Sequence, residues 1–215
     1  MSEKVTLIID GKTITADSDK TILEAALENG IYIPHLCSHE NLHPTGSCRL
    51  CVVGQQGVEG VVTSCITKVK EGMVIDTHDE MAEKIRKLSC DFMFKTHPSE
   101  CTGCPKFGKC QLQSISQYVG DTGRKLKANT IQVKANTENP IILHEMYRCI
   151  LCGRCVRACD EMRGVGAIKF EKVNGRMQVV INGDSLKDAN CRFCTACVEV
   201  CPTGSIREHK ELADK

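Results

Sequence analysis

The sequence has little aromatic material and contains no tryptophan. Only three Tyr and five Phe occur among its 215 residues, so aromatics make up 4% of the chain. This composition gives too little large apolar surface for one extensive core, and it favours two or three small domains. Small domains of this kind need a further source of stability besides apolar burial.

An excess of charge of one sign is also missing. The chain has 28 Lys and Arg residues against 27 Asp and Glu residues. Proteins that bind nucleic acid or anionic membranes normally carry a basic excess, so neither partner is expected. No apolar run approaches the ~20 residues of a membrane span, and the N-terminal segment MSEKVTLIID lacks the pattern of a secretory signal. We therefore expect a cytoplasmic protein with no membrane span.

Cysteine is the residue in excess, with 16 in the chain. Thiols stay reduced in the cytoplasm, so a cysteine-rich protein there is expected to bind metal rather than form disulfides. Most of these cysteines stand in C-x-x-C units, whose neighbouring thiols suit a shared metal site. Metal binding is thus the expected substitute for a large core.

Two runs of four cysteines form an internal repeat. Each has the spacing C-x2-C-x2-C-x3-C, and Pro202 follows the second run where Asp160 follows the first. In bacterial-type ferredoxins the fourth cysteine of each run binds the cluster of the other run. Zinc usually takes two pairs of ligands rather than two runs of four, so iron is favoured. The predicted ligands are Cys149, Cys152, Cys155 and Cys201 for one [4Fe–4S] cluster, and Cys191, Cys194, Cys197 and Cys159 for the second.

An N-terminal set of four cysteines has wider spacing: Cys37, Cys48, Cys51 and Cys65. It differs from the plant-type C-x4-C-x2-C pattern in its longer first gap, but it still offers four thiolates. Short β-branched runs, a hairpin signal at Asp10-Gly11 and a capping box at 21–24 surround it, which favours a β-grasp sheet. We predict a [2Fe–2S] cluster here, with a zinc knuckle or buried thiols as the alternative.

A third set has only three closely spaced cysteines, Cys101, Cys104 and Cys110. His97 stands four residues before the first of them, and an imidazole can complete a cluster. The rival fourth ligand is Cys90. Fifteen cysteines and His97 make sixteen ligands, enough for four clusters of four, so His97 is favoured and Cys90 is interpreted as a buried thiol. The other histidines near Cys37, at 35, 39 and 43, are interpreted as loop residues.

These sets predict an α+β protein with three domains. Residues 1–78 form the β-grasp [2Fe–2S] domain, with strands expected at 4–9, 12–16, 50–53, 58–63 and 73–76. Residues 79–119 form a small helical [4Fe–4S] domain with helices at 79–88 and 111–119. The polar segment 120–139 is interpreted as a linker. Residues 140–215 form a two-cluster ferredoxin domain with a hairpin around Asn174-Gly175.

In this order the four sets resemble the N-terminal iron–sulfur region of the largest peripheral subunit of complex I and of iron-only hydrogenases. The motifs that carry the resemblance are Ile33–Cys37, Gly46–Val53, the His97-x3-Cys101-x2-Cys104-x5-Cys110 set and the two quartets. The chain is most similar to the short electron-wire subunit of NAD(P)-linked or electron-bifurcating hydrogenases. This resemblance also implies His97, rather than Cys90, as a cluster ligand.

The resemblance implies a subunit that carries electrons between a flavoprotein NAD(P)H-oxidising subunit and a catalytic hydrogenase subunit, with soluble ferredoxin as a further partner. An equivalent subunit of a formate dehydrogenase or other complex I-like oxidoreductase is the alternative. We expect no catalytic, nicotinamide or flavin site in this chain, since no G-x-G-x-x-G motif opens a helix and little sequence follows the last quartet. A free multi-cluster ferredoxin, a redox sensor and a zinc-stabilised interaction module remain alternatives from other classes.

Overall fold

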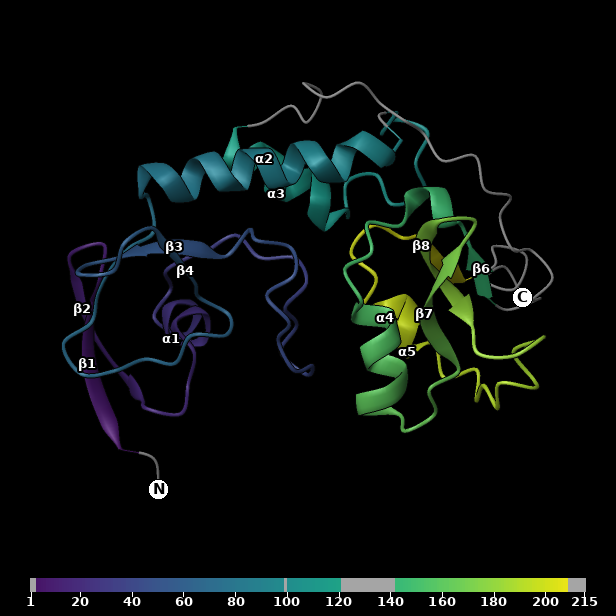
Figure 1. Ribbon diagram of the computed structural model, residues 1–215, viewed down its shortest axis with the longest axis horizontal. Coiled ribbons are helices and arrows are strands. Elements are labelled where there is room, and N and C mark those ends of the chain that lie inside the picture. The colour runs from purple at the N-terminus through teal and green to yellow at the C-terminus, as the bar shows by residue number, and fades with distance from the viewer. Residues whose placement is uncertain (1–2, 99, 121–141, 209–215) are drawn as a thin grey trace. The chain divides into compact units, whose positions relative to one another are not determined.

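A computed structural model describes residues 3–98, 100–120 and 142–208. The chain divides into two compact units, one of residues 1–38, 44–91 and 115–122 and the other of residues 39–43, 92–114 and 123–215. Figure 1 traces the elements of each unit along the chain. The segment interpreted as a linker lies, apart from Gly120, outside the described residues.

The first unit contains a five-stranded sheet with the order β2-β1-β5-β3-β4. Strand β1 pairs in parallel with β5, and the other neighbours are antiparallel. Helix α1 lies beside this sheet (Figure 1). This mixed sheet with one covering helix has the arrangement expected for a β-grasp domain. The bounds are β1 Lys4–Ile9, β2 Lys12–Asp17, α1 Ile22–Glu28, β3 Val52–Gln55, β4 Val61–Thr63 and β5 Val74–Asp76.

Two local sequence signals produce the expected structures in this unit. Asp10 and Gly11 both have positive φ, of 50° and 77°, as the tight turn between β1 and β2 requires. Thr21 caps α1, because its side chain accepts from the backbone N–H of Glu24 while the Glu24 carboxylate accepts from that of Thr21. The helix thereby presents Ile22, Leu23, Ala25 and Ala26 to a core shared with β1, β2 and β5.

Strand β3 is shifted by two residues relative to the expected range 50–53, and β4 begins later than the expected range 58–63 but ends at the same residue. Gly54, expected in the turn, is a strand residue that pairs with Val61 and Asp76. A Cβ added at Gly54 would lie 2.8 Å from the Cβ of Asp79, so this glycine permits a close approach of the chain before the next helix. Local sequence does not distinguish these two roles, because a glycine inside a strand and a glycine in a turn give the same signal.

Helix α2, Glu80–Thr96, is longer than the expected 79–88. Asp79 caps it as predicted, since its carboxylate accepts from the backbone N–H of Ala82 at 2.9 Å. No glycine or proline interrupts the chain before Pro98, so nothing in the local sequence stops the helix at residue 88. Helix α3, Gln111–Val119, agrees with the expected range.

The second unit has short elements around two small sheets. Strand β6 pairs with β9, and β7 pairs with β8 through the predicted turn at Asn174-Gly175, where both residues have positive φ. The core includes Ile142, Met146, Val179 and Ile206 together with Cys155, so a predicted cluster ligand is part of it. The bounds are β6 Ile142–His144, η1 Met146–Arg148, α4 Arg154–Arg157, η2 Ala158–Met162, β7 Ile168–Val173, β8 Arg176–Ile181, α5 Ala196–Glu199 and β9 Ile206–Glu208.

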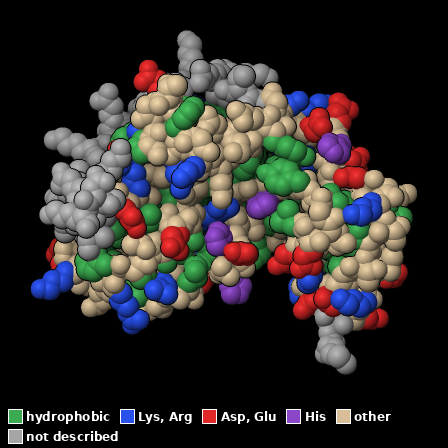
Figure 2. All heavy atoms as spheres, turned by 180° about the vertical axis from the view of Figure 1, so that it is seen from behind, with side chains coloured by type: hydrophobic (Ala, Val, Ile, Leu, Met, Phe, Trp, Pro, Cys, Tyr) green, Lys and Arg blue, Asp and Glu red, His purple; other side chains and the backbone are tan. Residues whose placement is uncertain are grey.

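Charged side chains of both signs are interspersed on the face drawn in Figure 2. This distribution agrees with the balanced charge of the sequence. Among the described residues, no helix combines the length and the apolar character needed to cross a membrane.

Candidate metal centres

The four N-terminal cysteines are brought together at the end of the sheet. All four are buried, and Cys37 and Cys51 are fully enclosed. Hydrogen bonds join the thiol of Cys37 to those of Cys48 and Cys65, and the thiol of Cys51 to that of Cys65. These bonds lower the pKa of Cys37, lower that of Cys51 to about 7, and raise those of Cys48 and Cys65. Four enclosed thiols in mutual contact provide the donor set that a metal centre with four thiolate ligands needs.

Arg86 of α2 holds the strand segment that follows this cysteine loop. Its guanidinium donates to the carbonyl oxygens of Leu50 at 3.1 Å, Val52 at 2.7 Å and Thr77 at 2.7 Å. The side chain is almost completely buried, and this burial lowers the pKa of the guanidinium. Leu50 and Val52 flank Cys51 in sequence. Arg86 therefore fixes the backbone on both sides of one predicted ligand.

His97 and its three cysteines line one pocket. The lining includes His97, Cys101, Cys104 and Cys110, with Phe107 and Arg148 beside them. Nδ1 of His97 lies 3.1 Å from the carbonyl oxygen of Arg148. The other ring nitrogen, Nε2, is therefore the one available to bind a metal. Burial lowers the pKa of His97 to about 4, the Arg148 carbonyl opposes that shift, and the Arg148 charge adds to it. A neutral imidazole at pH 7 is the form that binds metal.

The rival ligand lies elsewhere. Cys90 is fully buried on α2 and is not among the residues that line the His97 pocket. Arg148 contributes a second contact to that pocket, because its Nη1 donates to Sγ of Cys104 at 3.0 Å. A fixed positive charge at this distance stabilises a thiolate. Geometry therefore places His97, rather than Cys90, with the three cysteines.

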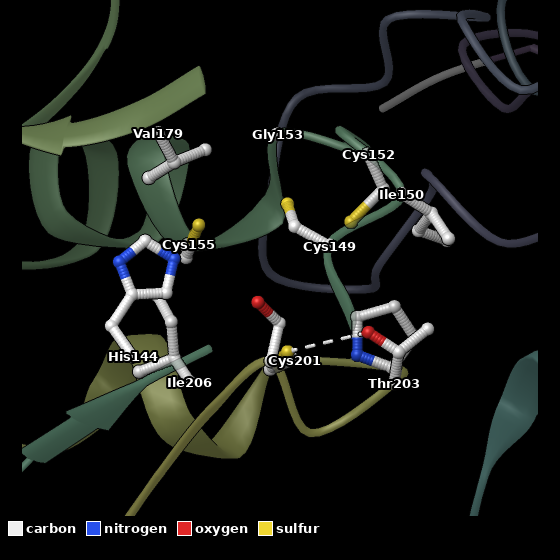
Figure 3. Close-up of a pocket in the computed structure, with 12 residues that line it drawn as sticks. His144, Cys149, Ile150, Cys152, Gly153, Cys155, Val179, Cys201, Thr203 and Ile206 are labelled. Atoms are coloured by element: carbon white, nitrogen blue, oxygen red, sulfur yellow. Dashed lines mark hydrogen bonds between the residues drawn. The ribbon is translucent and has the colours of Figure 1, made fainter. Parts of the chain in front are cut away.

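The first ferredoxin-like set also surrounds a pocket. Cys149, Cys152, Cys155 and Cys201 all line it, and Figure 3 shows their sulfur atoms around a common space. The fourth cysteine comes from the end of the second quartet, as the crossed assignment predicts. Burial raises the pKa of Cys149 to about 12 and also raises the pKa of Cys155 well above its usual value. Apolar side chains of Ile150, Val179 and Ile206 complete most of the wall.

The second ferredoxin-like set is grouped as well. Burial raises the pKa of Cys197 to about 12, and the nearby thiols of Cys159, Cys191 and Cys194 add to that rise. Cys194 has a lowered pKa, because hydrogen bonds from the Ala196 backbone and the Arg163 side chain outweigh its burial. Sγ of Cys159 accepts from the backbone N–H of Ala167 at 3.1 Å. Cys159 thus lies with the second quartet, although it belongs to the first in sequence.

The cysteine repeat is also a repeat of backbone shape. Leu151 and Phe193 have φ of 57° and 53°, and Gly153 and Thr195 have φ of 73° and 57°. Each pair occupies the same position relative to its quartet. Left-handed residues turn successive backbone N–H groups toward one side, and those of Leu151 and Phe193 reach cysteine sulfurs at 3.4 and 3.5 Å. The sequence repeat therefore encodes two similar loops for binding anionic sulfur.

The three loop histidines have contacts outside these four sets. His35 Nδ1 lies 2.8 Å from the carbonyl oxygen of Ile33. His39 Nδ1 accepts from the backbone N–H of Asn41. His43 contacts the Glu161 carboxylate with its backbone N–H at 2.8 Å, and with Nδ1 at 3.2 Å. These contacts agree with their interpretation as loop residues.

Sequence reasoning missed Arg86, Arg148 and His144. Arg86 could have been found from the sequence, because Ala82, Arg86 and Cys90 share one face of α2 and an arginine on such an apolar face is unusual. Arg148 directly precedes Cys149, but no sequence pattern shows that it reaches Cys104. His144 lines the pocket of the first ferredoxin-like set, and only the pairing of β6 with β9 places it there.

The chemistry of these donor sets fits iron–sulfur clusters. Three sets offer four thiols each, and the fourth offers three thiols and one neutral imidazole. No disulfide forms among the sixteen cysteines, all of which lie in the described residues. Within those residues, no group of three or more His, Cys, Asp or Glu side chains converges as ligands of a single metal ion. Fe–S clusters are bound by thiolates and, in some centres, by histidine.

Three families match successive parts of the chain. Residues 2–80 match the 2Fe-2S iron-sulfur cluster binding domain. Residues 86–123 match the NADH-ubiquinone oxidoreductase-G iron-sulfur binding region, and residues 148–205 match the 4Fe-4S dicluster domain. The predicted presence of a 2Fe-2S domain and of 4Fe-4S binding domains is thereby confirmed.

Relatives align over nearly the whole chain. The alpha subunit of NADPH-Fe(3+) oxidoreductase from Geobacter sulfurreducens is 38% identical over 202 residues, which are 94% of this chain and 24% of that protein. Subunit HndD of the NADP-reducing hydrogenase of Solidesulfovibrio fructosivorans is 32% identical over 97% of this chain and 37% of its own length. The chain thus spans about a quarter to a third of the length of these curated relatives.

A solved structure extends the similarity to the fold. One chain of an NAD+-reducing [NiFe]-hydrogenase in the H2-reduced state superposes with a TM-score of 0.86 and 29% identity, covering 96% of this chain and 88% of that one. NADH-quinone oxidoreductase G subunits are similar over 94% of this chain, including one from Rhizobium meliloti at 33% identity. The chain therefore carries matches to three iron–sulfur domain families and is homologous to subunits of NAD(P)-linked hydrogenases and of complex I-like oxidoreductases.

Proposed function

We propose that this chain holds one [2Fe–2S] and three [4Fe–4S] clusters and carries electrons within an NAD(P)-linked hydrogenase. The proposed ligands are the four sets described above, including His97 with Cys101, Cys104 and Cys110. When bound, iron–sulfur clusters supply one-electron redox centres, and the protein sets their spacing, hydrogen bonding and dielectric. No catalytic residue is assigned to the chain.

The observation that best supports electron transfer is the junction at Arg148. Its carbonyl oxygen accepts from His97 Nδ1 at 3.1 Å and from Thr203 Oγ1 at 2.9 Å. Its Nη1 donates to Cys104 Sγ, while the next residue in the chain is Cys149. One residue therefore contacts the His97 set and is covalently joined to the first ferredoxin-like set. Such adjacency suits passage of electrons between neighbouring centres.

The surrounding groups suit anionic clusters of low solvent access. Backbone N–H groups of Leu151, Ala167 and Phe193 donate to cysteine sulfurs. Hydrogen bonds to sulfur and burial both tune the potentials of such centres. The cysteines of the N-terminal set are the most completely buried of the four sets. The chain can therefore hold sites of different potential along its length.

We infer the partners from the relatives. The NAD+-reducing hydrogenase chain superposes over 88% of its length, which makes hydrogenase the first choice of terminal enzyme. A flavoprotein NAD(P)H-oxidising subunit is the proposed partner at the nicotinamide end, and soluble ferredoxin is a further one. We place the complex in the cytoplasm, where the thiol ligands stay reduced. An equivalent role in a complex I-like oxidoreductase is supported by the G-subunit relatives.

The deciding experiment is anaerobic purification of the native protein with its partner chains. Iron, sulfide, zinc and flavin are then counted per copy, and the partners are identified by mass spectrometry. We expect about fourteen irons in this chain, from one two-iron and three four-iron clusters, with a flavoprotein and a hydrogenase beside it. Stoichiometric zinc with little sulfide would overturn the proposal in favour of an interaction module. Recovery as a lone iron-loaded chain would favour a free ferredoxin.

A further inference from the structure

His144 presents a buried polar atom that no described residue satisfies. It ends strand β6 and lines the same pocket as Cys149, Cys155 and Cys201. Its Nε2 is inaccessible to solvent and has no hydrogen-bond partner within residues 3–98, 100–120 and 142–208. Buried ring nitrogens are normally paired, so an unpaired one in a ligand pocket indicates a partner that fills the pocket.

The surroundings of His144 limit what that partner can be. The lining of the pocket consists of the four cysteines, apolar side chains such as Val179 and Ile206, and the chain around Thr203. Figure 3 shows the imidazole of His144, a residue of strand β6, next to Cys155. The four cysteines already supply a full set of ligands for a cubane cluster. His144 is therefore available as a hydrogen-bond donor rather than needed as a ligand.

The internal repeat provides a comparison within the same chain. His144 stands five residues before Cys149, and Leu186 stands five residues before Cys191. Leucine offers no donor to sulfur. The two quartets have matching cysteine spacing and matching left-handed residues, yet they differ in this side chain. The repeat is thus asymmetric where a side chain can act on the bound group.

We propose that His144 donates an Nε2–H hydrogen bond to a sulfur atom of the cluster bound by Cys149, Cys152, Cys155 and Cys201, and thereby raises the reduction potential of that cluster. The inference rests on the proposed cluster assignment. Donation to sulfur stabilises the reduced cluster, which carries the additional negative charge. His144 is therefore a residue that tunes this cluster without binding it.

The test compares the full-length wild type with His144→Leu and His144→Gln, all loaded anaerobically. Midpoint potentials are measured by redox titration with EPR detection, and a Cys149→Ser variant identifies the signal of the cluster concerned. His144→Leu is expected to keep the wild-type iron and sulfide content but shift that potential to more negative values. His144→Gln, which retains a donor, should recover part of the shift. The control variant His78→Leu, which changes an exposed side chain of the first unit, should leave the midpoint potential of this cluster unchanged.

Two results would overturn this role. Unchanged potentials in both His144 variants would show that no hydrogen bond to the cluster exists. Loss of the cluster in both variants would show a ligand or structural role instead. If the variants do not fold, pulsed EPR of wild type labelled with ¹⁵N-histidine decides the matter. A weak nitrogen coupling in addition to that of His97 supports donation, and its absence refutes it. An iron count well below that of four clusters in the wild type would instead refute the cluster assignment itself.

Discussion

His97 and Arg148 are joined by a hydrogen bond between Nδ1 and the backbone carbonyl oxygen, 3.1 Å apart. A carbonyl oxygen can only accept, so Nδ1 carries the proton and Nε2 is left with its lone pair. This bond fixes both the tautomer and the ring orientation, as second-layer partners do for metal-bound histidines. The residue that orients the imidazole also donates to Cys104 and precedes Cys149, so it organises two predicted sites together.

Removal of the imidazole should remove one cluster. We expect His97→Ala to lose about four irons per chain and one [4Fe–4S] EPR signal, because three cysteines cannot complete the site. Cys90→Ala should keep all signals, since Cys90 does not line that pocket. Iron analysis and EPR of the anaerobic proteins provide the measurement. The opposite pattern, with loss only in the Cys90 variant, would reverse the assignment.

Removal of the Arg148 guanidinium should shift a potential without removing iron. Arg148→Met loses the contact of Nη1 with Cys104 Sγ but keeps the backbone carbonyl that binds His97. A hydrogen bond to a charged group contributes about 1.5–3 kcal/mol. The reduction potential of the His97 cluster should therefore become more negative by roughly 60 mV or more. Arg148→Lys, which retains the positive charge, is the control and should shift this reduction potential less. An unchanged potential with full iron content would contradict a direct electrostatic role.

Arg86 should determine the stability of the [2Fe–2S] site. Arg86→Met leaves the carbonyls of Leu50, Val52 and Thr77 without their buried donor. Each unsatisfied buried acceptor costs about 1–3 kcal/mol, so we expect a loss of about 3 kcal/mol or more. The readout is the urea concentration at which the [2Fe–2S] visible circular dichroism disappears. Lys84→Met removes an exposed side chain of the same helix that is paired with exposed Glu80, and it should cost under about 0.5 kcal/mol. Equal effects of both substitutions would refute the anchoring role.

Glu145 should make the second unit sensitive to acid. Its carboxylate accepts from Tyr147 and from the guanidinium groups of Arg148 and Arg207. Burial opposes ionisation, but these bonds outweigh it and lower the pKa of Glu145 below 4.5. The ionised Glu145 carboxylate therefore stabilises the fold fully above the pKa that Glu145 has in the unfolded chain. This stabilisation is lost as the pH falls through the lower pKa that Glu145 has in the folded protein.

The measurement for Glu145 compares wild type with Glu145→Gln. At pH 7 the variant should unfold at lower urea concentration, as judged by bleaching of the [4Fe–4S] absorbance. The difference between the urea concentrations at which the two proteins unfold should shrink as the pH is lowered below the usual pKa range of a carboxyl group. Acid damage to the clusters affects both proteins, so it cancels in the comparison. A difference that stays constant with pH would show that the ionised carboxylate is not responsible.

The cysteine spacing and the local turn signals allowed much of this protein to be predicted. The positive φ values at Asp10-Gly11 and Asn174-Gly175 and the cap at Thr21 follow from neighbouring residues alone. The α+β class and the succession of iron–sulfur domains followed from the same local patterns and from the resemblance that they carry. Local sequence is sufficient for these features, because the groups that interact are only a few residues apart.

Only the tertiary structure could decide which groups act on the sites from a distance. Arg86 reaches Leu50 and Val52 across 36 and 34 residues, and Arg148 reaches Cys104 across 44. His144 enters a cysteine pocket because β6 pairs with β9 at the other end of the domain. The sequence by itself predicted which residues would hold metal, because ligand chemistry and spacing are local properties. Folding decided which charges and donors surround them, because those contacts depend on how distant segments pack.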